Sequence, residues 1–68
     1  MKCHENDKIR CTYPLSIKTS SGYTLHIAVG DIFAYECPMI GGHSIETAEG
    51  RLYVSADIFD SCFEKVES

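Results

Sequence analysis

The sequence predicts a mainly β fold: a small, strongly bent, five-stranded antiparallel barrel that is closed by a short C-terminal helix. Short runs of alternating apolar and polar residues are separated by turn-forming residues about every ten positions, which is typical of small β domains. Residues 51–66 predict a strand that continues directly into a short helix with one apolar face. With 68 residues, we expect one domain (residues 1–68), with residues 1–7 as a loose lead-in.

The first predicted strand begins at Ile9. The odd positions that follow are apolar, whereas most even positions are polar, which is the pattern of a half-buried strand. The apolar set is Ile9, Cys11, Tyr13, Leu15 and Ile17. Pro14 interrupts this run. Because proline has no N–H to donate to a ladder, it indicates an edge strand or a bulge at this point.

Three further strands are predicted between residues 23 and 47. Residues 19–22 predict a loop, and residues 23–29 then alternate more regularly than any other stretch. Gly30-Asp31 predicts a tight turn into a strand over residues 32–36, which Cys37-Pro38 is expected to end. Gly41-Gly42 lets the chain reverse into a short strand over residues 43–47, with Ile45 as its inward residue.

The last strand and the helix complete the predicted barrel. Residues 48–50 form a turn, after which Leu52 and Val54 alternate with Tyr53. Ser55 offers a hydroxyl to the free N–H groups of a helix start, and Asp57 suits the positive end of the helix dipole. The apolar face of the helix is expected to consist of Ile58, Phe59, Cys62 and Phe63.

The net charge of −4 is unevenly distributed along the chain. Residues 1–29 contain four basic and two acidic residues, whereas residues 30–68 contain eight acidic and two basic residues. An acidic protein gains nothing from counterion release on phosphates, so nucleic-acid binding is disfavoured. The polar N-terminus and the lack of an apolar run of ~18 residues predict a cytoplasmic protein without a membrane segment.

The four cysteines are expected to be reduced core or surface thiols. They are Cys3, Cys11, Cys37 and Cys62. Their spacing lacks the Cys-x-x-Cys knuckle of a zinc site, although Cys3 and His4 could join Cys37 or His43 if the fold gathered them. We therefore expect no metal and no cofactor, with a zinc-stabilised domain as the less favoured alternative.

The sequence does not predict an enzyme. His43 and Ser44 are neighbours on a predicted strand, and neighbouring strand residues point to opposite faces, so they do not form a base–nucleophile pair. His26 lies at an outward position of its strand and is expected to contact solvent. Gly41-Gly42-His43-Ser44 lacks the lysine of a phosphate-binding loop.

A protein-binding surface is the favoured interpretation. The residues expected to carry it are the acidic Asp31, Glu36, Glu46 and Glu49 and the aromatic Tyr35 and Tyr53. Tyrosine is an efficient interface anchor, and acidic side chains steer a protein towards a basic partner. The alternative is that the aromatic rings are part of the core and that the acidic residues only keep the protein soluble.

The chain also resembles a loose group of small proteins carried by phages and conjugative elements of low-GC bacteria. The motifs that carry the resemblance are Ile9-Arg10-Cys11, Val29-Gly30-Asp31-Ile32-Phe33, Gly41-Gly42-His43-Ser44-Ile45-Glu46 and Phe63-Glu64-Lys65-Val66. The loop at residues 19–22 is shorter than in that group, and Tyr53 stands where the group has tryptophan. The resemblance implies an SH3-like barrel in a mobile-element protein and supplies no catalytic residues.

These observations predict a non-enzymatic interaction module, phage-encoded, that binds and inhibits a host defence or nucleic-acid-processing protein with a basic surface. Two alternatives stay open. A small barrel can bind nucleic acid through aromatic and basic side chains, for which only Lys2, Lys8, Arg10 and Lys18 are available. The second alternative is a structural or self-assembling domain, which would form homodimers through an uncovered edge strand.

Overall fold

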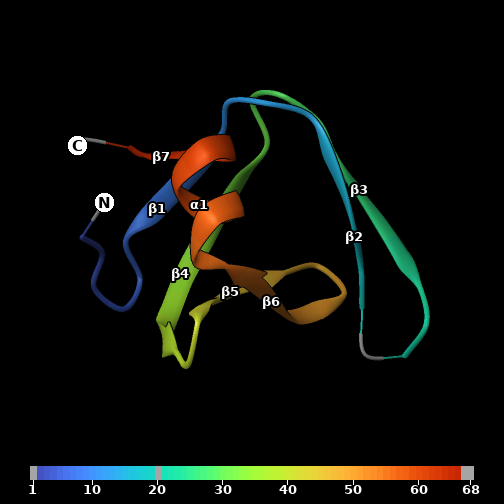
Figure 1. The fold of residues 1–68 in the computed structure, drawn as a ribbon. Coiled ribbons are helices and arrows are strands. Elements are labelled where there is room, and N and C mark those ends of the chain that lie inside the picture. Colours follow the sequence, from blue (N-terminus) through green and yellow to red (C-terminus); the bar gives the residue numbers. More distant parts are fainter. Residues whose placement is uncertain (1, 20, 67–68) are drawn as a thin grey trace.

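The computed structural model describes residues 2–19 and 21–66, so Met1, Ser20, Glu67 and Ser68 lie outside the description. The described residues form seven strands and one helix (Figure 1). The elements are β1 (Lys8–Cys11), β2 (Leu15–Lys18), β3 (Thr24–Ile27), β4 (Ile32–Met39), β5 (Gly42–Thr47), β6 (Gly50–Ser55), α1 (Ala56–Cys62) and β7 (Phe63–Lys65). A mainly β fold with one short helix near the C-terminus is therefore confirmed.

The strands form two separate antiparallel sheets. The larger sheet has the order β6-β5-β4-β1-β7, and the smaller one is the β2–β3 hairpin. Among the described residues no ladder joins the two sheets, so the predicted closed barrel does not form. The reason lies around Pro14, where the expected single strand over residues 9–18 divides. Its first part, β1, pairs with β4 and β7, and its second part, β2, pairs only with β3.

Strand β4 is longer than predicted and bends at Glu36. The pairing with β5 shifts register between Tyr35 and Cys37, which makes Glu36 the extra residue of a β-bulge. The strand then continues through Pro38, which lies opposite His43, to Met39. The prediction that Cys37-Pro38 ends the strand was wrong. Strand β1 pairs only with Ile32–Ala34 of β4. The part of β4 around Pro38 therefore has a strand, β5, on one side only, and a proline is accommodated there.

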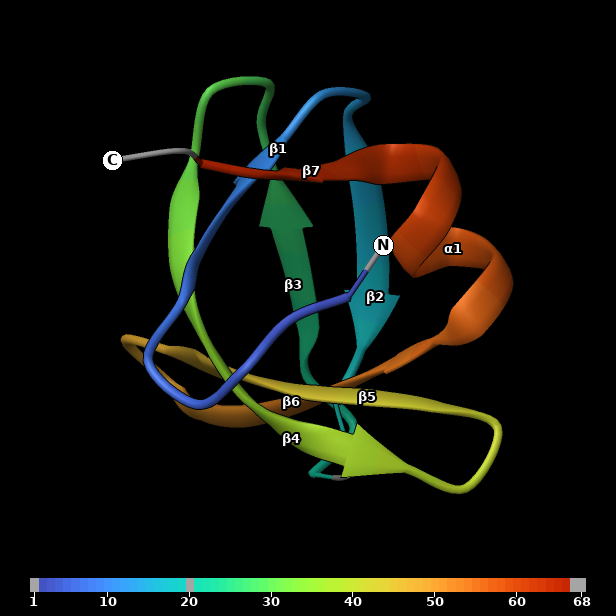
Figure 2. The ribbon, with the colours of Figure 1, turned by 90° about the vertical axis from the view of Figure 1, so that its left-hand side faces the viewer.

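The core lies between the five-stranded sheet, the β2–β3 hairpin and α1. In Figure 2, β5 and β6 run across the direction of β2 and β3, so the hairpin covers the side of the core that the larger sheet leaves open. The buried hydrophobic residues are Ile9, Cys11, Ile27, Tyr35, Ile45, Leu52, Val54, Phe59 and Phe63. Leu15, Ile17 and Leu25 of the hairpin pack against this cluster and are partly buried.

The helix begins after Ser55 as predicted but ends before Phe63. Asp57 lies in its first turn, while the Ser55 side chain makes no capping hydrogen bond. Phe59 is the buried residue of the helix, and Ile58, expected on the same face, is 40% exposed. Phe63 instead begins β7, which pairs with β1. No residue pattern indicated β7, because three residues are too few to show a strand alternation.

His4, Asn6 and Asp7, within the segment expected to be a loose lead-in, make hydrogen bonds in the structure. The Asn6 N–H donates to the Tyr35 carbonyl at 2.9 Å, and the Tyr35 N–H donates to the Asp7 carbonyl at 2.7 Å, so this segment extends along β4. The Asp7 carboxylate accepts the His4 N–H at 2.8 Å and lies 3.3 Å from the Lys65 ammonium group. The hydrogen bond from His4, followed by the nearby Lys65, lowers the pKa of Asp7 below its ordinary value.

Candidate functional site

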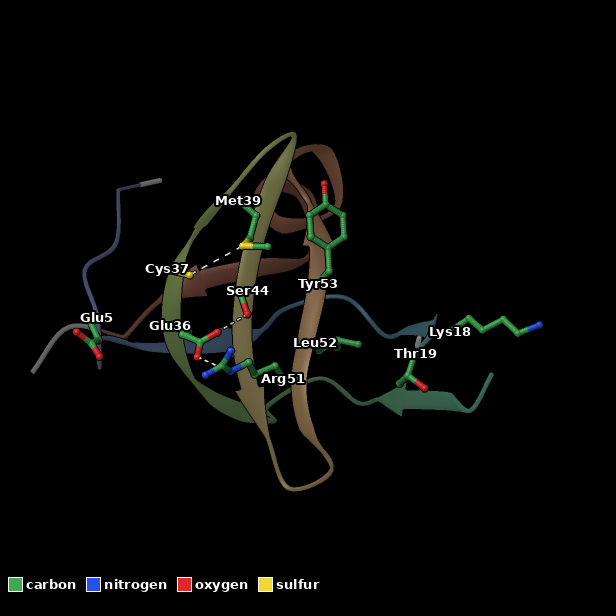
Figure 3. A pocket seen from close by; sticks show the side chains of 10 residues that line it. All are labelled: Glu5, Lys18, Thr19, Glu36, Cys37, Met39, Ser44, Arg51, Leu52 and Tyr53. Carbon is green, nitrogen blue, oxygen red and sulfur yellow. Dashed lines mark hydrogen bonds and ion pairs between the residues drawn. The ribbon is translucent and has the colours of Figure 1, made fainter. Parts of the chain in front are cut away.

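A groove of about 580 Å³ lies on the outer face of β4, β5 and β6, the side turned away from the core (Figure 3). Glu5 lies at one side of the groove, and Lys18 and Thr19 lie at the opposite side. The residues that line it are Glu5, Lys18, Thr19, Glu36, Cys37, Met39, Ser44, Arg51, Leu52 and Tyr53. Its volume is within the range of about 300–1,000 Å³ that is typical of ligand sites.

Strand alternation explains why Ser44, Arg51 and Tyr53 share one face. In β6, Leu52 and Val54 are buried, so Arg51 and Tyr53 point outwards. The ladder pairs Ser44 with Tyr53, and Glu46 with Arg51, which places Ser44 and Glu46 on the same outer face. The outer face formed by β4, β5 and β6 is therefore polar along its middle.

Glu36 is the central charged residue of the groove. One carboxylate oxygen accepts the Ser44 hydroxyl at 2.6 Å, and the other lies 2.8 Å from Arg51 Nε (Figure 3). The Glu36 side chain is only 17% exposed, whereas the Arg51 side chain is 77% exposed. Ser44 is itself buried, and its hydroxyl is satisfied by Glu36. The bulge in β4 thus presents a carboxylate that the Ser44 hydroxyl holds in place and that is open towards the groove.

Apolar side chains border the groove at the β4–β5 turn. Met39 and Tyr53 are half exposed, and Ile40, at the tip of the turn, is 100% exposed. The Tyr53 hydroxyl donates to the Ile40 carbonyl at 3.0 Å, which ties the turn to β6. The turn therefore presents a cluster of exposed apolar side chains, Met39, Ile40 and Tyr53, on a hydrogen-bonded support. We call it the tip cluster.

Tyr35 is not part of this surface, and its prediction as a binding anchor was wrong. It pairs with Ile45 on the core side of the ladder and is only 3% exposed. Its hydroxyl is 2.8 Å from His43 Nδ1, and burial raises its pKa. The His43 ring stacks on Phe59 with 4.2 Å between ring centroids, so His43 and Ser44 indeed face opposite sides of β5.

The other predicted binding residues do not form one continuous surface. Tyr53 and Glu36 line the groove, and Glu46 lies beside Arg51 on the same face. Glu49 lies in the β5–β6 turn, where it lines a smaller cavity of about 100 Å³. Asp31 lies at a different turn, between β3 and β4, where its carboxylate accepts the Ala28 N–H at 2.9 Å. Its role there is to hold the turn.

The residues of this site that the sequence interpretation missed include Met39, Ile40, Ser44 and Arg51. One signal for Arg51 was available. A two-residue turn between Thr47 and Gly50 brings Glu46 opposite Arg51, and an acidic residue opposite a basic one is a favourable cross-strand pair. The contact between Arg51 and Glu36 was not accessible, because it depends on the bulge in the neighbouring strand.

The cysteines form no disulfide, and all four are free. Cys11 is buried, donates to the Tyr13 carbonyl at 3.0 Å, and has a pKa that burial raises. Over residues 2–19 and 21–66, no three His, Cys, Asp or Glu side chains gather in a way that could hold a metal ion. His26, on the outer side of the hairpin, is 2.8 Å from the Ser16 hydroxyl through Nδ1.

Comparison with known proteins gives no match to a family model, to a curated protein or to a solved structure. The resemblance to small phage and mobile-element proteins therefore stays a prediction. In the part of the chain that the structure describes, the helix is not long and apolar enough to cross a bilayer.

Proposed function

We propose that this protein is a non-enzymatic protein-interaction module that binds its partner through the tip cluster and the adjoining groove. The observation that carries the proposal is the full exposure of Ile40 between half-exposed Met39 and Tyr53. Complete burial of one such aliphatic side chain contributes about 1.5–3 kcal/mol, so leaving several exposed together on one turn favours a binding role.

The support beneath the tip cluster suits an interface. The turn is connected to β6 by the Tyr53 hydroxyl, and the strands on either side are paired along their length. Ordering these side chains on binding therefore requires little additional loss of conformational freedom. The apolar centre is bordered by polar side chains of the groove, which is the usual composition of a protein–protein interface.

The partner we propose is a host protein with a basic surface, and the chain would be a phage-encoded cytoplasmic inhibitor of a host defence or nucleic-acid-processing protein. The net charge of −4 and the exposed Glu46 and Glu49 support a basic partner through steering. As part of this proposal, the fold is an SH3-like one in which the two sheets that the described residues form are not joined into a closed barrel.

Ile40→Asp is expected to weaken partner binding about tenfold or more, because it places a charge at the centre of the apolar contact. The partner is first isolated on tagged protein from nuclease-treated bacterial lysate, and its affinity is then measured by calorimetry. Val29→Asp is the matched control, since Val29 is also exposed (61%) but lies near the β3–β4 turn. Equal binding by wild type and Ile40→Asp would refute the proposal.

Glu46→Lys combined with Glu49→Lys is expected to slow association with the partner, mainly at low salt, and to leave the melting temperature nearly unchanged. Both side chains are exposed, so their reversal alters the long-range field and not the packing. Stopped-flow association rates at several salt concentrations measure this effect. An association rate that is the same as wild type at low salt would show that the acidic residues do not steer binding.

A further inference from the structure

We propose that the Glu36 carboxylate receives an arginine side chain of the partner protein, and that Arg51 occupies this position until the partner binds. This inference rests on the proposed function and names the contact that would accompany the tip cluster. It is carried by the groove, by the bulge at Glu36 and by the unequal burial of Glu36 and Arg51.

Glu36 is prepared to accept a cation. The bulge directs its side chain into the groove, and the buried Ser44 hydroxyl fixes one carboxylate oxygen at 2.6 Å. A carboxylate that is 17% exposed and backed by protein interacts more strongly with a cation than one in bulk water. Bulges commonly direct a side chain towards a functional site in this way.

Arg51 shows which chemistry fits this carboxylate, and it is held weakly. Its guanidinium approaches Glu36 through Nε at 2.8 Å, while the side chain stays 77% exposed. By contrast, Arg10 approaches Glu64 through both Nε and a terminal nitrogen. Because the Arg51 side chain is largely exposed, side-chain entropy and solvation oppose its fixation on Glu36, so an arginine from a partner can replace it.

The displaced Arg51 has a second acceptor on the same face. The ladder places Glu46 directly opposite Arg51, so the released guanidinium can pair with Glu46. Exchange of the two arginines therefore leaves neither cation without a carboxylate. The incoming side chain would pass between Met39 and Tyr53, where its aliphatic part packs on the thioether and its guanidinium meets an aromatic ring.

The first test uses a small probe and requires no partner. Isotope-labelled protein is titrated with N-acetyl-arginine N-methylamide, with N-acetyl-norleucine N-methylamide as the matched uncharged probe. NMR then follows the Arg51 Nε–H signal and the Glu36 side-chain carboxyl carbon. We expect saturable shifts of both signals with the arginine probe alone. Equal responses to the two probes, or no response of these signals to either, would overturn the inference.

The second test uses the isolated partner. Glu36→Gln keeps the shape of the side chain and is expected to weaken binding about tenfold or more, because the charge-assisted hydrogen bond is lost. Arg51→Gln is expected to tighten binding about two- to fivefold, since it removes the internal competitor. Glu64→Gln, which breaks the exposed Arg10 pair away from the groove, serves as the control. Circular dichroism verifies that each variant is folded.

The two tests separate this inference from the proposed function. If Ile40→Asp abolishes partner binding while Glu36→Gln and Arg51→Gln bind like wild type, the interaction surface is correct and the arginine contact is wrong. If Ile40→Asp binds like wild type, the proposed function itself fails. Tighter binding by Arg51→Gln is the result that a merely structural ion pair would not produce.

Discussion

Replacing Phe59 with alanine is expected to remove a large part of the protein's free energy of unfolding. Phe59 is fully buried and lies at the centre of the aromatic core, where its ring contacts His43, Tyr35 and Phe63. Removal of a buried phenylalanine ring costs about 3–5 kcal/mol. A domain of this length has a total stability of only about 3–10 kcal/mol. Urea denaturation followed by circular dichroism measures the loss.

Ile58→Ala provides the matched control for Phe59. Ile58 is the preceding residue of α1 and is 40% exposed, so its truncation is expected to cost no more than about 1 kcal/mol. A loss of similar size for the two variants would mean that α1 does not insert Phe59 into the core as described.

Gly42→Ala is the second change with a large expected effect, because no room exists for a Cβ atom at this position. An added Cβ would lie 2.3 Å from the Val54 carbonyl oxygen and 2.9 Å from Ser55 Cα, both of which belong to the paired backbone of β6. Relief requires β5 and β6 to separate, which we expect to destabilise the protein by about 3 kcal/mol. Thermal melting and urea midpoints measure the change.

Gly22→Asn is the control for the glycine prediction. Gly22 has a positive φ of 84° but no atom within 4 Å of an added Cβ, and asparagine tolerates this backbone conformation better than most residues. We expect a loss below about 1 kcal/mol for this variant. If Gly42→Ala proved as mild as Gly22→Asn, β5 and β6 would not approach each other as closely as the structure shows.

Much of the local structure could be predicted because its signals lie within a few consecutive residues. Strands β3, β5 and β6 follow the alternation of apolar and polar positions, and the helix begins directly after Ser55. The turn glycines Gly30 and Gly41 have positive φ values, which is the conformation that their place between strands indicated. These features depend on neighbours in the sequence.

The features that could not be predicted depend on distant pairing. Nothing near Pro14 indicates that the chain moves from one sheet to the other there, and a closed barrel was the simpler expectation. Pro38 within β4 is acceptable only because β1 pairs with an earlier part of that strand. The three residues of β7 adopt a strand because β1 offers an edge to pair with. Each outcome is decided by where another strand lies.

In the candidate site, too, some features follow from neighbouring residues and others depend on distant pairing. Alternation put Tyr53 on the side of β6 opposite Leu52 and Val54, and the structure shows that this side is exposed. For Tyr35 the same rule did not show which face of β4 was buried, and the pairing with Ile45 decides that. Glu36 lines the groove and is the extra residue of a bulge that no residue pattern in β4 revealed.

The pairing of β1 with β7 has a consequence for the order in which the strands pair during folding. Ile9 pairs with Lys65, and the Val66 N–H donates to the Lys8 carbonyl, so one edge of the sheet joins residues from opposite ends of the described chain. During folding, β1 keeps one unpaired edge until β7 reaches it. Because a long loop must close to bring these strands together, we expect this pairing to form after the local β4–β5 and β5–β6 hairpins.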